Sequence, residues 1–275
     1  MMPRRLIETS LVRSMSKAGL FFLLAMAALG GAQAQRVAPG LATVTESAVG
    51  VSLIGYEYDE PGVMTLKARK LGIDYSGTYA LTSQWPNVSQ GWFVRGEVQY
   101  AVGDADYSSP VSGNLNGTEN WYVEVRGQLG RDFQMQGYVL APYVGLGFRH
   151  LYHDLRGTTS TGNVGYQREN ELQTASMGFT HRIKLSGGAR LSTTLEYMHL
   201  LKGIQRSKDY PGVGDVQNKQ NSGYGLRMSS MWRVENWSFG PTITYWNIKD
   251  SEVVRNVFEP KNKTTEFGFK TVYHF

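Results

Sequence analysis

Two groups of acidic and histidine residues have the types and the spacing that could activate a water molecule. Asp104 and Asp106 stand two residues apart, so they share one face of an extended strand. His153 and Asp154 are adjacent further along the chain and lie close to His150. Paired carboxylates beside a histidine can take a proton from water and so drive hydrolysis. Charged residues at strand ends are also commonly just solvated, and we expect no enzymatic activity, with a hydrolytic site as the alternative.

No other motif in the chain supports catalysis or the binding of a cofactor or a metal. Ser222 lies in the stretch KQNSG, which offers no histidine to act as its base. The glycines of GLGF at 145–148 are not followed by a helical pattern, so they do not form a phosphate-binding loop. None of the five histidines has the spacing of a metal ligand with a suitable partner. We therefore expect neither a cofactor nor a metal ion.

Two segments show a clear alternation of apolar and polar residues, which is typical of β-strands with two unlike faces. The segments 92–102 and 121–129 place valine and aromatic residues on one face and charged residues on the other. In a soluble barrel the apolar face fills the core, whereas in a membrane barrel it faces lipid and the charges lie inside. The alternation alone is compatible with both arrangements.

Other features of the chain favour the membrane barrel. Aromatic residues gather near the predicted strand ends, as they do in the girdles at the two surfaces of a membrane. Long and short connections alternate along the chain. No apolar run after residue 34 is long enough for a spanning helix, and such a chain can cross a bilayer only as a closed barrel. We predict an all-β fold, a closed antiparallel transmembrane β-barrel of about ten strands, with eight or twelve as alternatives.

Some segments do not fit regular strands. The segment 63–80 changes the phase of its alternation near Lys70, which predicts a β-bulge there. Pro142 and Pro241 fall inside predicted strands, where proline removes a ladder hydrogen bond, so we expect both to lie at bulges. Long outer loops are predicted at 103–117, 153–164, 203–220 and 249–263.

The charged residues of the predicted strands fall on the face that a membrane barrel turns inward. Opposite charges on neighbouring strands, such as Arg95 and Glu97 beside Glu124 and Arg126, can pair across the ladder. A barrel of about ten strands has little room for water, so we expect a polar plug that neutralises itself, with a narrow solute or ion pore as the alternative. The predicted lumen charges are Arg95, Glu97, Glu124, Arg126, Arg149, Arg190, Glu196, Arg227, Arg233, Glu266 and Lys270.

The last segment of the chain, 264–275, is a strand with one aromatic face. Phe267, Phe269, Tyr273 and Phe275 share that face, and the chain ends on it. The pattern resembles the closing strand of bacterial outer-membrane β-barrels, a class in which this strand is also the assembly signal. The resemblance implies insertion by the barrel-assembly machinery.

The first 34 residues have the composition of a secretory signal peptide. Basic residues precede an apolar run at 18–29, and the small-residue pattern Ala32-Gln33-Ala34 follows it. The run is too short to span a membrane, and Met15 is a candidate initiator. We expect residues 1–34 to be removed as a signal peptide, 35–48 to form a short periplasmic segment and 49–275 to form the barrel.

Composition and charge exclude several classes of protein. The chain has no cysteine, which removes disulfides and thiolate metal sites and suits export through an oxidising periplasm. The formal net charge is +5, and most of the excess lies in the predicted signal peptide. A basic surface for nucleic acid therefore has no support, and we expect no nucleic-acid partner.

At the level of pattern, the mature chain resembles the small outer-membrane β-barrels of the opacity and omptin type, without a motif that selects one family. The omptins are ten-stranded outer-membrane proteases that use an Asp pair and an Asp-His pair. Asp104 and Asp106 match the first pair, whereas the adjacent His153 and Asp154 depart from the spacing of the second. The likeness to opacity-type barrels implies that the charged loops contact lipopolysaccharide phosphates or another surface ligand. We expect a monomer. We expect a mainly structural or surface-binding outer-membrane barrel.

Overall fold

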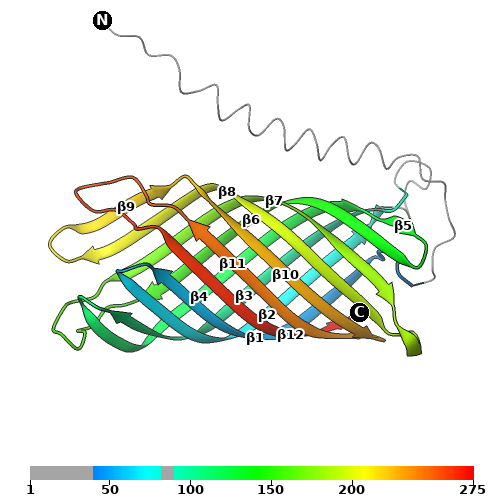
Figure 1. Cartoon of the computed structure of the whole chain (residues 1–275), viewed down its shortest axis with the longest axis horizontal. Coiled ribbons are helices and arrows are strands. Elements are labelled where there is room, and N and C mark those ends of the chain that lie inside the picture. The colour runs from blue at the N-terminus through cyan, green and yellow to red at the C-terminus, as the bar shows by residue number, and fades with distance from the viewer. Residues whose placement is uncertain (1–39, 82–89) are drawn as a thin grey trace, which may run out of the picture. The chain divides into compact units, whose positions relative to one another are not determined.

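Ten long antiparallel strands make up most of the residues that the computed structural model describes, 40–81 and 90–275 (Figure 1). The predicted signal peptide at 1–34 lies outside the described residues. Within them, no helix is long and apolar enough to cross a membrane. The long strands are β1 (Glu46–Glu60), β2 (Met64–Ala80), β3 (Trp92–Ser109), β4 (Gly113–Arg131), β6 (Tyr138–Asp154), β7 (Gln167–Lys184), β8 (Arg190–Tyr210), β10 (Gly223–Val234), β11 (Trp237–Ile248) and β12 (Asn262–His274). Shorter elements are β5 (Phe133–Met135), β9 (Gly214–Gln220) and the 3-10 turn η3 (Ser186–Gly188).

Two contacts between strands that are not consecutive close the sheet into a barrel. β1 pairs with β12, and the backbones of Ser47 and Phe275 exchange hydrogen bonds of 3.0 and 2.8 Å. β8 pairs with β10, while β9 continues the outer hairpin of β8. Each long strand thus has two neighbours, and the wall has no free edge. The prediction of an all-β, closed antiparallel barrel of ten strands is confirmed.

The two ends of the barrel differ. The first strand begins and the last strand ends at one end, and the β8–β9 hairpin projects from the other (Figure 1). The predicted signal peptide would leave the start of β1 in the periplasm, so we name the end with Ser47 and Phe275 the periplasmic end and the opposite one the outer end.

The outward face of the wall carries a broad apolar band. Phe267 is 63% exposed although it is large and apolar. Trp121 stacks on Tyr152 at 5.2 Å toward the outer end, and Trp237 lies 5.0 Å from Tyr273 at the periplasmic end. An exposed apolar band between two aromatic girdles is what a barrel surrounded by lipid requires.

The two faces of β2 exchange character at the point where the strand leaves the apolar band. Ile73 points outward into the band, whereas Leu66, nearer the outer end, points inward. Lys67 and Arg69 are exposed on the outward face at that level. The register of β2 with both neighbours is continuous, so the β-bulge predicted near Lys70 is wrong. The pattern changes phase because the surroundings of the wall change from lipid to water.

The outer half of the barrel is packed like a soluble protein. Its interior holds apolar clusters, one of which joins Met64, Leu66 and Leu155. The predicted loops at 103–117 and 203–220 fold mostly into paired strands, contrary to expectation, since their alternate apolar residues can pack into this core.

Pro142 and Pro241 lie at interruptions of a ladder rather than at bulges. Pairing of β6 with β4 stops at Tyr143, and pairing of β6 with β5 resumes at Leu140 in the same register. β11 shows a similar gap in its pairing with β10 around Pro241. No extra residue is inserted at either gap, so the expected bulges are wrong. Each ladder leaves out the position whose nitrogen has no hydrogen to donate.

The change of surroundings along β2 predicts that substitution by arginine at two positions of one face has unequal effects on stability. Ile73→Arg puts a charge in the apolar band and should lower the free energy of unfolding by about 2–4 kcal/mol. Thr65→Arg, on the same face beyond the band, should change it by less than about 0.5 kcal/mol. Urea titration of refolding into lipid vesicles measures both, and equal losses would contradict the placement of the lipid boundary.

Candidate functional site

The middle of the lumen holds a buried arginine between two carboxylates. Arg149 of β6 lies 3.2 Å from Glu124 of β4 and also pairs with Glu266 of β12. Its guanidinium sits 3.9 Å from the centroid of the Tyr122 ring. All four side chains are buried. Tyr122 and Glu124 share β4, the neighbour of β6, whereas Glu266 lies on the distant strand β12. The pair of Arg149 with Glu266 therefore ties the wall of the barrel to itself across the lumen.

Glu124 also lies at the centre of a larger set of ion pairs. It lies 3.2 Å from Arg126 and 2.6 Å from Arg227. Arg126 in turn reaches Glu97 at 2.5 Å and Glu196 at 2.8 Å. A buried charge is tolerated only when it is paired, and here each arginine meets at least two carboxylates. We call this set the central network: Glu97, Glu124, Arg126, Arg149, Glu196, Arg227 and Glu266.

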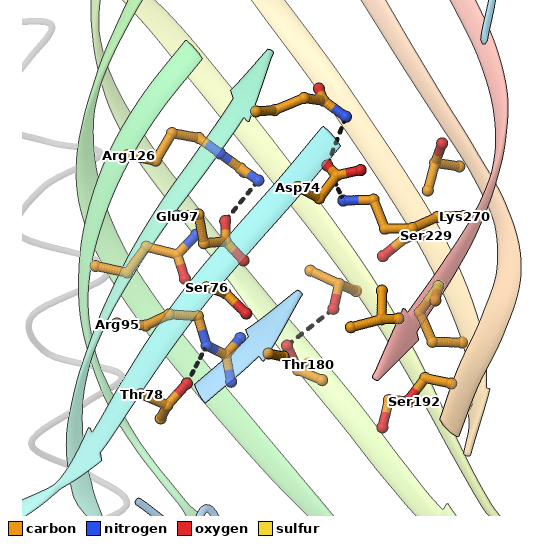
Figure 2. A pocket seen from close by; sticks show the side chains of 18 of the residues that line it. Asp74, Ser76, Thr78, Arg95, Glu97, Arg126, Thr180, Ser192, Ser229 and Lys270 are labelled. Atoms are coloured by element: carbon orange, nitrogen blue, oxygen red, sulfur yellow. Dashed lines mark hydrogen bonds and ion pairs between the residues drawn. The ribbon is translucent and has the colours of Figure 1, made fainter. Parts of the chain in front are cut away.

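A further ion pair lies beside the central network. Lys270 of β12 is 2.7 Å from Asp74 of β2, which also accepts a hydrogen bond of 2.8 Å from Gln99. Figure 2 shows this pair and, on the other side of Glu97, the bond of 3.0 Å that the Nε of Arg95 donates to Thr78.

The periplasmic mouth is occupied by residues 40–45, which belong to the predicted periplasmic segment. Leu41 is completely buried there. The backbone N–H and the hydroxyl of Thr43 both donate to Asp132, at 2.5 and 2.9 Å. Arg182 holds the same carboxylate at 3.0 Å and donates to the carbonyl of Leu41, while Arg190 donates to the carbonyl of Gly40. We call residues 40–45 the N-terminal segment.

A polar cavity of about 270 Å³ lies between the N-terminal segment and the central network. Figure 2 shows Arg95, Glu97 and Arg126 on one side of it, and Ser192 and Ser229 across from them. Charged and hydroxyl side chains line this part of the lumen, whereas the outer half also contains apolar clusters.

The outer half of the lumen contains buried polar groups beside its apolar clusters. The Nζ of Lys70 lies 4.2 Å from the centroid of the Tyr56 ring and donates to Asn120. Further out, the Nε2 of His153 is 2.9 Å from the hydroxyl of Thr118. These side chains are buried, so they fill the lumen rather than face a substrate.

The outer mouth is closed by the loop at 249–261. Its Glu259 is buried and pairs with Arg168 of β7, which also holds Glu60 of β1 at 2.7 Å. The hydroxyl of Tyr58 donates to both carboxylates, at 2.6 and 2.9 Å. Burial and the neighbouring carboxylate of Glu60 raise the pKa of Glu259 to about 7, although Arg168 opposes the shift. We call the residues 249–261 the outer loop.

The residues proposed for hydrolysis are not brought together. Asp104 and Asp106 point outward from β3, where their backbone partners are Arg69 and Lys67. His153 points into the lumen, on the other side of the wall. Asp154 forms an ion pair with Arg156. The ring of His150 packs against Trp121 in the aromatic girdle toward the outer end, with 5.4 Å between the ring centroids. Among the described residues, no group of three or more His, Cys, Asp or Glu side chains is arranged to hold a metal ion.

All eleven predicted lumen charges lie on the inward face. Ten of them line the polar cavity, and Arg149 closes its outer side. Inward residues that the sequence interpretation did not include are Lys70, Asp74, Asp132, Arg168 and Arg182. Asp74 alternates with Ile73 and Tyr75 in the sequence, so the same two-residue period could have identified it. With a β-bulge predicted at Lys70, the alternation does not assign the side chain of that residue to either face.

The charged residues of the predicted loop 203–220 lie on strands. Arg206 of β8 is 2.5 Å from Glu171 of β7, and Lys208 pairs with Glu169. These pairs stand on the outward face beyond the apolar band, where they form part of a charged ring around the outer end.

Comparison with known proteins supports the fold. The outer membrane protease OmpT from Escherichia coli has a TM-score of 0.58 at 11% identity, over 88% of this chain and 99% of that one. The β domain of the Bordetella autotransporter BrkA has a TM-score of 0.41 at 11% identity, over 85% and 100%. The translocator domain of NalP from Neisseria meningitidis has 0.40 at 9% identity, over 96% and 98%. Neither a protein-family model nor a curated protein matches the chain.

The likeness to OmpT concerns the fold alone, because only 11% of the residues are identical. The scores of the two autotransporter domains are too low to carry an argument. The likeness to OmpT agrees with the closed ten-stranded wall and its apolar band, which make up the fold of small outer-membrane β-barrels. The family within that class stays unresolved.

Proposed function

We propose that the protein is a non-conducting outer-membrane barrel with a structural and surface-binding role at its outer end. The observation that carries the proposal is the occupied lumen. The N-terminal segment fills the periplasmic mouth, the central network crosses the middle and the outer loop covers the outer mouth. An ion would have to displace buried, paired charges at two of these levels, which is unfavourable.

The proposed location is the Gram-negative outer membrane, reached after removal of the signal peptide. The outward apolar band and its aromatic girdles support this location. Phe267, Phe269 and Tyr273 lie on the outward face of β12, and Phe275, directly after the strand, is exposed as well, so the barrel-assembly machinery can contact all four. Because the wall closes within one chain, a monomer suffices.

The outer end is the surface that we propose for binding. Lys67 and Arg69 of β2 and Lys263 of β12 are exposed directly beyond the apolar band. Phosphate groups of lipopolysaccharide lie at that level of the outer leaflet, and cations at the rim can donate charge-assisted hydrogen bonds to them. The paired strands beyond the band make this end a rigid platform for a surface ligand.

The alternatives receive less support. A narrow pore would require the N-terminal segment and the outer loop to leave the lumen together. A hydrolase of omptin type would need Asp104, Asp106, His153 and Asp154 on one surface, and they are divided between the two faces of the wall.

Conductance measurements test the proposal directly. Refolded full-length protein, shown to be folded by its shifted gel mobility before boiling, should give no discrete steps in a planar lipid bilayer. The occupied lumen is the reason. Reproducible steps whose size rises with salt concentration would overturn the proposal in favour of the narrow pore.

The central network predicts a large cost for a conservative change at its centre. Glu124→Gln should lower the free energy of unfolding by about 3 kcal/mol, because three arginines lose a buried carboxylate while each keeps another. Glu57→Gln is the matched control, since Glu57 pairs with Lys67 on the exposed outward face, and should cost less than about 1 kcal/mol. Urea titration measures both, and similar costs would contradict the burial of the central network.

The outer loop should dock less tightly as the pH rises. Glu259 has a pKa of about 7 when docked against an ordinary value of 4.5, so the docked state binds the proton more strongly. The proton's contribution to docking is complete below about pH 4.5 and is lost as the pH rises through about 7. Arg168, Glu60 and Tyr58 face this carboxyl group.

A spin label can follow this change, because the chain has no native cysteine. The label on Val253→Cys, an exposed position of the outer loop, should be more mobile at pH 8 than at pH 5. Glu259→Gln in the same background should remove the difference. A difference that persists in that variant would assign the pH response to other groups.

A further inference from the structure

The polar cavity at the periplasmic end is large enough for one small solute. We call it the periplasmic chamber. Its volume is about 270 Å³. Ligand sites of proteins begin at about this size. The N-terminal segment covers its mouth, and the central network forms its floor.

The charges around the periplasmic chamber are not balanced along its length. The central network has four glutamates and three arginines, so its excess is negative. Near the mouth, Asp132 pairs with Arg182 and Glu46 pairs with Arg233 at 2.8 Å. Arg95 and Arg190 lie at the same level without a carboxylate within 4.0 Å among the described residues. The mouth therefore carries an excess of two positive charges.

Arg95 has the geometry of a cation that awaits an anion. Its Nε is held by the hydroxyl of Thr78 at 3.0 Å, which orients the guanidinium. Figure 2 shows this side chain at the wall of the cavity, beside Thr78 and below Glu97. A planar guanidinium with free N–H groups is well suited to a carboxylate or phosphate. Arg190 adds positive potential at the mouth and contacts the protein there through the carbonyl of Gly40.

The wall opposite Arg95 offers hydroxyl groups between its charged side chains. Ser192 of β8 and Ser229 of β10 face the cavity in Figure 2, and Thr242 of β11 lines it as well. Two further polar groups that line it, the Oε1 of Gln128 and the hydroxyl of Tyr143, are buried and have no hydrogen-bond partner in the described protein. Hydroxyl and amide groups of this kind recognise the hydroxyls of a solute.

The geometry points to the periplasmic chamber as a binding site for a small hydroxylated organic anion, of the class of sugar phosphates and sugar acids. The anionic group meets Arg95, within the positive field to which Arg190 contributes. The hydroxyls of the solute meet the serines and threonines of the opposite wall. The solute enters from the periplasm when the N-terminal segment moves aside, and the barrel stays closed toward the outside, so binding needs no conduction.

Calorimetric titration of the refolded, full-length protein tests this inference, with glucose 6-phosphate, glucose and inorganic phosphate as probes. Glucose 6-phosphate should bind at least tenfold more tightly than either of the other two. Arg95→Gln should weaken that binding at least tenfold. Arg156→Gln is the matched control, because Arg156 is exposed beyond the outer end of β6, where it pairs with Asp154, and it should leave the binding unchanged.

A second variant keeps the test independent of any folding defect in the first. Ser229→Val should weaken the binding of glucose 6-phosphate and leave that of inorganic phosphate as it is. Absence of heat with every probe would overturn the inference, as would equal binding by the Arg95→Gln and wild-type proteins. Equal affinity for glucose 6-phosphate and inorganic phosphate would overturn the role of the hydroxyl wall. None of these outcomes bears on conduction, which the bilayer measurement decides separately.

Discussion

The requirement that every backbone amide in hydrocarbon finds a partner determines the rest of this structure. The ladders of β1 with β12 and of β8 with β10 meet that requirement by removing the edges of the sheet. Closure makes one face of each strand the outside and the other the lumen. Because side chains alternate with a period of two, half of the residues in the wall must then enter a lumen that is only ten strands wide.

That crowding explains why the inward charges form a network. The lumen cannot hold enough water to solvate them singly, so Glu124 meets Arg126, Arg149 and Arg227 at once. Beyond the lipid boundary the constraint is reversed. Water surrounds the wall, and the inward face takes Leu66 where a membrane segment would have a polar residue. The strands thus keep one register in both lipid and water, and only the face that carries the apolar residues changes.

The sequence predicted what depends on the two-residue period, and failed where something other than that period decides. The closure of the wall, its ten strands and the inward placement of the eleven charges follow from the alternation of apolar and polar residues along the chain. The position of the lipid boundary does not, so the change of phase at Lys70 was interpreted as a bulge. For the same reason the segment 203–220 was expected to be a loop.

The sequence also does not predict which residues far apart in the chain form ion pairs. Arg168, Glu60 and Glu259 meet because a loop folds back over the mouth, and nothing in their spacing indicates it. Conversely, Asp104 and His153 have suitable types for chemistry, yet each is fixed on its own face of the wall by the phase of its strand. Side-chain type suggests a reaction, but in a barrel the parity of a residue within its strand decides which compartment it can serve.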